Sequence, residues 1–177
     1  MLAFVALEVL GPVFGDEPGR ELPWGLTAVP LTFDPPVSSP EELGVTPHPL
    51  PTPGPIPLLL PTAPVRLANL AEFPIAVVTA EASVFRLFDD HLVTFLTRLG
   101  CDADRVRLED NGAHGNSHGF IQELNNTEAL GVVTGWLAER GLTAPVGQEA
   151  YPTAVRVPNG ILAPGKQGIS PRHLRTR

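Results

Sequence analysis

Two histidines, His114 and His118, lie on a short polar loop whose residue types suit proton transfer. The loop runs from Asp110 to His118, is rich in glycine and asparagine, and follows a β-branched, apolar run, Arg105 to Leu108. An imidazole can accept and return a proton near neutral pH, so either histidine is a candidate general base. Acyl transfer would also need a nucleophile, and a carboxylate that orients the imidazole.

A nucleophile is the part of this chemistry that the sequence does not supply. Residues 115–119 formally match the pattern G-x-S-x-G, with Ser117 at the centre. A serine activated in this way stands on a tight turn directly after a strand, and precedes its acid and its histidine in the chain. Several loop residues separate Ser117 from Leu108, and apart from the histidine of the same loop only His173, in the tail, lies downstream of Ser117 to supply a base. Ser83 is expected to cap the helix that comes after it. We therefore predict no nucleophile in this chain.

Metal and cofactor sites are not expected. His114 and His118 have the i, i+4 spacing of two zinc ligands on a helix, but Gly115 and Asn116 between them oppose a helix. No glutamate follows His114 as in H-E-x-x-H, and no Gly-rich phosphate loop is present. Cys101 is the lone cysteine, which leaves neither an internal disulfide nor a zinc cluster.

The order of apolar patterns predicts an α/β fold that resembles the closing half of a doubly wound sheet. Leu2 to Leu7 is an unbroken apolar run, typical of a strand buried on both faces. The last helix is expected to bury Leu130, Val133, Trp136 and Leu137. The predicted elements are strands at 2–7, 74–79 and 106–108 and helices at 84–99, ending at Gly100, and at 127–140.

A proline-rich segment, residues 11–64, interrupts this pattern. About a dozen of the 21 prolines lie between Pro30 and Pro64. Proline removes backbone donors, so neither regular helix nor sheet is expected there. The segment also contains Trp24, Phe33 and the run Leu58 to Leu60, apolar material that is unusual in a free linker. A cap over an active site and a floppy insertion are the two alternatives.

Composition limits the class of protein. The 177-residue chain is long enough for one domain, expected at residues 1–141, and its net charge of −7 argues against nucleic acid or an anionic membrane as a partner. Met1 to Leu7 is too short for a membrane span and lacks the basic residues of a signal peptide, so a cytoplasmic protein is expected. Residues 142–177 should form an irregular extension with a solvated basic end, Lys166 to Arg177.

The residues from Glu109 to Asn126 resemble the terminal signature of an atypical, esterase-like branch of the α/β-hydrolase superfamily, roughly "GIHGNGHMMMLEKNN". The segment Pro23 to Leu43 is similar to the same family's region between its sixth and seventh strands. The chain departs from the family at Gly119-Phe120, where methionines usually follow the histidine. The resemblance covers roughly residues 2–140 and implies the C-terminal half of such a domain, with the proline-rich segment as its cap.

The resemblance also implies site residues. His118 matches the catalytic histidine and His114 the histidine before it, which makes His114 the runner-up. The run Ala80 to Ser83 is similar to the branch's "GEAS", and this branch takes its acid from the end of the sixth strand. That position corresponds to Glu8, with Glu81 as the alternative. A carboxylate at the carboxyl end of a parallel strand is also where such sheets place functional groups.

The function implied is hydrolysis of a small hydrophobic carboxylic ester through a serine acyl-enzyme. The nucleophile elbow and oxyanion loop of the family have no counterpart here, so we expect a truncated enzyme with little activity by itself. The apolar edge of the strand at 2–7 would then favour self-association or pairing with an N-terminal half. The alternative is an inactive remnant or an assembly subunit that retains the half-fold.

Overall fold

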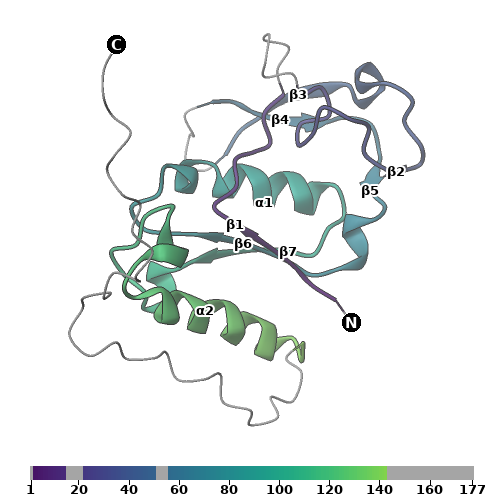
Figure 1. The fold of residues 1–177 in the computed structure, drawn as a ribbon. Helices are drawn as coiled ribbons and strands as arrows, with labels where there is room; N and C mark the ends of the chain where they lie inside the picture. The colour runs from purple at the N-terminus through teal and green to yellow at the C-terminus, as the bar shows by residue number, and fades with distance from the viewer. Residues whose placement is uncertain (1, 15–21, 51–55, 143–177) are drawn as a thin grey trace, which may run out of the picture. The chain divides into compact units, whose positions relative to one another are not determined.

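Three parallel strands form the central sheet of the protein, whose computed structural model describes residues 2–14, 22–50 and 56–142 (Figure 1). The strands are β1 (Phe4–Leu7), β6 (Ile75–Thr79) and β7 (Ala103–Arg107), in the spatial order β1-β6-β7. Phe4 is in register with Ile75, which in turn is in register with Ala103. The fold is therefore mixed α/β with a parallel sheet.

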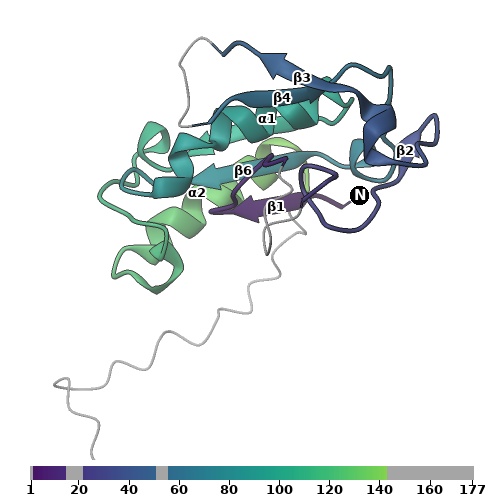
Figure 2. The same ribbon diagram turned by 90° about the horizontal axis from the view of Figure 1, so that it is seen from above.

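One helix covers each face of this sheet, as the two ribbon views show (Figures 1 and 2). The helices are α1 (Asp89–Arg98) and α2 (Asn126–Glu139). Side chains alternate along β6, so Ile75 and Val77 pack in the cluster with α1 while Ala76 and Val78 pack in the cluster with α2. All five β6 residues are buried, as the sequence predicts for a central strand.

Strand β1 differs from the prediction of burial on both faces. Phe4 is 51% exposed and Leu7 40% exposed. Within the described residues β1 pairs with β6 alone, so its other edge is open. An unbroken apolar run indicates that both faces of a strand are suited to burial. It does not indicate whether the residues that bury them belong to the same stretch of chain.

The two helices also depart from prediction in detail. Residues 84–99 are not one helix, because a 3₁₀ helix, η3 (Val84–Leu87), precedes α1. Val84 is 57% exposed, so its place in the apolar repeat does not put it on the buried face. On α2, Trp136 is buried as predicted, whereas Leu130 is 59% exposed and Ala129 is buried in its place.

The proline-rich segment contains regular structure, contrary to the prediction. Two antiparallel pairs form, β2 with β5 and β3 with β4. A pair of strands has two outer edges, where the missing N–H of a proline leaves no partner unsatisfied. The elements of this region are β2 (Phe33–Asp34), η1 (Pro40–Leu43), β3 (Val45–His48), β4 (Leu58–Pro61), β5 (Arg66–Leu67) and η2 (Leu70–Glu72).

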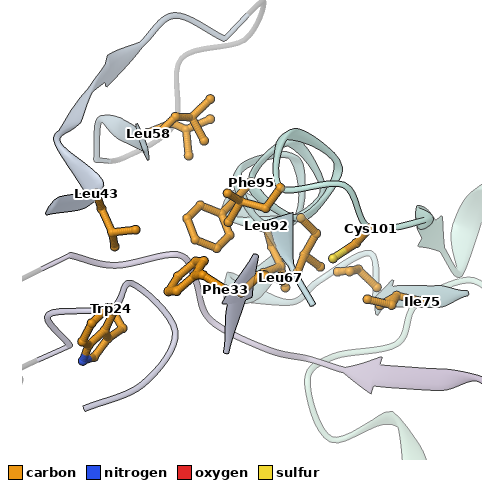
Figure 3. Packing of buried hydrophobic residues seen from close by; sticks show 13 residues of the cluster. Trp24, Phe33, Leu43, Leu58, Leu67, Ile75, Leu92, Phe95 and Cys101 are labelled. Carbon is orange, nitrogen blue, oxygen red and sulfur yellow. The ribbon is translucent and has the colours of Figure 1, made fainter. Parts of the chain in front are cut away.

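The described part of this segment packs into the core on the α1 side of the sheet. Leu43, Leu58 and Leu67 are each at most 2% exposed and belong to the same cluster as Phe95 of α1 (Figure 3). Trp24 and Phe33 extend the cluster, with ring centroids 5.9 Å apart. These described residues are therefore packed rather than floppy.

Some sequence predictions fall outside this description. Residues 143–177, with the basic run Lys166 to Arg177, lie outside the described residues. Within the described ranges, no helix has the length and apolar character needed to cross a membrane.

The packing of the proline-rich segment predicts the effect of truncating Leu43. Leu43→Ala should lower the free energy of unfolding by about 2–5 kcal/mol, because a side chain only 1% exposed leaves a cavity. Val29→Ala, at a position 66% exposed in the same segment, should change it by less than about 0.5 kcal/mol. Urea denaturation measures both, and equal small effects would show that the segment contributes little to the core.

Candidate functional site

Carboxylates follow all three strands of the parallel sheet at their carboxyl ends. Glu8 comes directly after β1, Glu81 lies two residues beyond β6, and Glu109 begins the 3₁₀ helix η4 (Glu109–Asn111) after β7. Because parallel strands end at one edge of a sheet, these groups meet on the same side of the molecule. The predicted histidine loop, between η4 and η5 (Phe120–Gln122), lies at this edge as well.

Glu8 bridges β1 to the turn after β6. Its carboxylate accepts a hydrogen bond from the backbone N–H of Ala80 at 2.6 Å and another from the hydroxyl of Ser83. Burial raises the pKa of Glu8 above its usual value, although these two bonds and the nearby charge of His118 act in the opposite direction. The backbone of Glu8 has φ +52°, a left-handed conformation that is uncommon for a non-glycine residue and often marks functional positions.

His118 lies near Glu8. Within the described residues, no hydrogen bond joins the two side chains. The two are close enough that the charge of His118 lowers the pKa of Glu8. The imidazole is exposed and stands edge-on to Phe85, with ring centroids 6.3 Å apart and planes at 79°. The favoured acid and base thus lie on one edge, with the imidazole open to solvent.

The two runner-up residues contact each other. His114 Nδ1 lies 3.4 Å from Glu81 Oε2, with the two side chains 67% and 43% exposed. Glu81 also accepts the backbone N–H of Gly115 at 2.9 Å, and this bond is the main cause of the lowered pKa of Glu81. Solvent screens a pair as exposed as this one, so it is a weaker candidate for an oriented acid–base pair.

The two serines considered as nucleophiles have other partners. Ser83 is the N-cap of η3, as predicted, and accepts the N–H of Phe85 at 3.0 Å while donating to Glu8. Ser117 donates both its hydroxyl and its backbone N–H to Glu123. Neither hydroxyl donates to a histidine in the described part of the chain. That no residue of this chain is the nucleophile remains a prediction.

Ion pairs that sequence reasoning missed hold the strand ends together. Asp89, only 1% exposed, accepts two hydrogen bonds from Arg107, at 2.7 and 2.9 Å, and one from Thr79 at 3.0 Å. The hydrogen bonding of Arg107 to the Asp89 carboxylate is the main cause of the raised pKa of Arg107. Arg86 Nη2 lies 2.7 Å from Glu109 Oε1, which joins η3 to η4. Charges scattered along a sequence carry no local signal for such pairs.

Comparison with known proteins gives one informative similarity. The chain is 30% identical over 141 residues to the probable secreted lipase phiG of Fungal sp. (strain ATCC 74256). The matched region is 77% of this chain, and the chain spans 39% of the relative's length. No protein-family model matches the chain, and no solved structure matches it at a significant level. The similarity supports a hydrolase of the lipase or esterase type.

The same similarity corrects the predicted location. The relative is described as secreted, which contradicts the cytoplasmic location expected from the sequence. That expectation was wrong because it relied on Met1 to Leu7, and the first residues of a chain that spans part of its relative say nothing about export.

The raised pKa of Glu8 predicts a pH-dependent gain in stability for Glu8→Gln. A raised carboxyl pKa means that the folded state binds the proton more tightly than the unfolded state does. Stability of the natural protein therefore falls as the pH rises from about 4.5 through the raised pKa of Glu8. Glutamine does not titrate and can still accept the N–H of Ala80, so the variant avoids this loss.

Thermal unfolding from pH 4 to pH 8 measures the effect. Glu8→Gln should unfold at an equal or higher temperature than the natural protein at pH 7, and the difference should shrink toward pH 4. Glu128→Gln, at an exposed position on α2, is the control. If Glu8→Gln instead unfolds at a lower temperature than the natural protein at pH 7, and this difference disappears at low pH, folding lowers the pKa of Glu8.

Proposed function

We propose that the chain is the part of a lipase- or esterase-type hydrolase that supplies its general base, His118, and its acid, Glu8. The observation that carries the proposal is that both lie against the short segment from Ser83 to Phe85, since Ser83 donates to Glu8 and the ring of Phe85 stands edge-on to His118. The similarity to a probable secreted lipase supports it. The relative's name suggests a secreted protein with a water-insoluble ester as substrate, and we propose the same for this chain.

In the proposed reaction a serine from outside the described residues attacks the ester carbonyl. His118 takes the hydroxyl proton as the serine oxygen bonds to the carbon, and gives it to the departing alkoxide. It then takes a proton from water, whose oxygen attacks the acyl-enzyme, and returns that proton to the serine. Glu8 stabilises the imidazolium that forms in each half of the reaction, as the carboxylate of a triad does.

The nucleophile is proposed to come from polypeptide that pairs with β1. The N–H of Phe4 donates to Pro74, directly before β6, and that of Glu8 donates to Val78 of β6. The alternating backbone groups of Val5 and Leu7 therefore point to the open edge. Beside this edge lies an apolar groove of about 430 Å³ between β1 and α2. An added strand would cover both and would end next to Glu8 and His118. The residues that line the groove are Val5, Leu7, Phe120, Ile121, Asn126, Thr127, Ala129, Leu130 and Val133.

The proline-rich segment is proposed to cap the site. It begins within a few residues of Glu8, and its first described turn packs back on this start: the N–H of Val13 donates to the carbonyl of Gly25 at 2.9 Å. Gly25 has φ +83°, and a side chain there would meet the ring of Phe14. A cap held in this way and lined with apolar side chains would favour a hydrophobic ester.

A second candidate function is that of an inactive assembly subunit. The open edge of β1 favours it, because such an edge binds another strand whether or not chemistry follows. Self-association through this edge would make a dimer of the chain alone, which light scattering would detect.

Kinetics on a longer polypeptide test the proposal. The coding DNA upstream of the Met1 codon is read in all three frames, and a longer chain that includes any G-x-S-x-G segment found there is assayed on p-nitrophenyl esters. His118→Ala should lower kcat by at least about 10³-fold, because the base is lost. His114→Ala should retain most of the activity. An active His118→Ala variant would exclude His118 as the base, and a stop codon upstream would favour the assembly subunit.

A further inference from the structure

A buried amide lies at the centre of the loop that carries His118. The side chain of Asn116 is 0% exposed. Its Nδ2 donates to Glu123 Oε2 and to Asn125 Oδ1, both at 2.7 Å, and its Oδ1 accepts from Asn125 Nδ2 at 3.0 Å. Both donors and the acceptor of this amide are therefore satisfied, as burial of a polar group requires.

The carboxylate of Glu123 holds the residue directly before His118. It accepts the backbone N–H of Ser117 at 3.0 Å and the hydroxyl of the same residue. The bond from the Ser117 hydroxyl is the largest cause of the lowered pKa of Glu123, followed by those from the Ser117 N–H and Asn116. Glu123 is therefore ionised at neutral pH, and hydrogen bonds to an ionised group are the stronger kind.

The same loop is tied at two more points. The carbonyl of Asn116 accepts the N–H of Ala82 at 2.9 Å, which joins it to the turn whose Ala80 and Ser83 hold Glu8. The carbonyl of His114 accepts from Asn125 Nδ2 at 3.1 Å. The backbone on the N-terminal side of His118 is thus fixed to the start of α2 and to the turn after β6.

We propose that Glu123 and Asn116 are positioning residues for His118: their carboxylate–amide pair fixes the backbone at Ser117, so that the imidazole stays edge-on to Phe85 at the edge that carries Glu8. The proposal rests on the proposed role of His118 as the base. A base carried on a loop needs such support, because loops are more mobile than helices and strands, and a misplacement of about 1 Å can reduce catalysis by roughly 100-fold.

Glu123→Gln is the test variant, because it keeps the size of the side chain and removes its charge. Whichever way the new amide turns, its NH₂ faces a donor, either Asn116 Nδ2 or the N–H of Ser117. Glu128→Gln, another glutamate on the same stretch of chain but exposed on α2, is the matched control. Ser117→Ala, which removes only the hydroxyl, replaces the test variant if that variant does not fold.

The first readout is the nuclear Overhauser effect between the ring protons of His118 and Phe85 in this chain. The natural protein and Glu128→Gln should show it, and Glu123→Gln should lose most of it. The indole N–H of Trp136, which donates to Asp104 at 2.7 Å, should keep its chemical shift in all three, because the sheet is unchanged. An undiminished effect in Glu123→Gln would overturn the proposal.

The second readout separates this proposal from the proposed function. In an active longer chain, Glu123→Gln should lower kcat by about 10-fold or more, with KM within about twofold, since placement of the base affects the chemical step. If His118→Ala is inactive while Glu123→Gln keeps its kcat, the positioning role of Glu123 is wrong, and the assignment of His118 as the base is retained. If His118→Ala is active, the proposed function fails, and the ring contact alone then decides whether Glu123 fixes the loop.

Discussion

The buried carboxylate of Asp89 is the interaction on which the site edge depends. A charge that is 1% exposed is tolerated only with full compensation, and Arg107 and Thr79 supply it from the ends of β7 and β6. Asp89 also begins α1, where a negative charge is favourable at the helix N-terminus. One side chain therefore fixes two strand ends and the start of one helix. The positions of the turns that follow these strands depend on it.

The loops at this edge also use carboxylates to satisfy nearby donors. Glu8 satisfies donors of the turn after β6, Glu109 pairs with Arg86, and Glu123 satisfies donors of the histidine loop. Glu8 and Glu109 each join segments that are distant in the chain, whereas Glu123 closes its own loop. At this edge the ring of His118 is exposed while hydrogen bonds fix the loop around it, which is the arrangement that the proposed base would need.

Much of the sheet and its helices could be predicted from the sequence, because local apolar patterns report burial directly. Strand β6, with five buried residues, is confirmed almost to its ends, and so is the existence of α1 and α2. The pairing of Phe33 with Leu67 could not be predicted, because it joins short stretches far apart in the chain. The open edge of β1 was expected, because the resemblance leaves this strand without one of its sheet neighbours, whereas the exposure of Phe4 and Leu7 was not.

Prediction of the site was uneven for a similar reason. The resemblance to a hydrolase family suggested His118 and Glu8, and both follow strands of the parallel sheet at its carboxyl edge. Their roles as base and acid stay predictions. The motif also contained Asn116 and Glu123, but polar residues between strand and helix resemble any surface turn. The burial of Asn116 and its pairing with Glu123, on which their proposed role rests, become visible only in three dimensions.

The measurement that tests the central claim most directly is the location of the serine that reacts with a fluorophosphonate. The reagent bonds covalently to an activated serine hydroxyl, and mass spectrometry of the digested protein identifies the residue. The account predicts no adduct on this chain alone, and an adduct outside residues 1–177 in an active longer chain. An adduct on Ser117 or Ser83 of the isolated chain would contradict it, because the nucleophile would then lie within the part that carries His118 and Glu8.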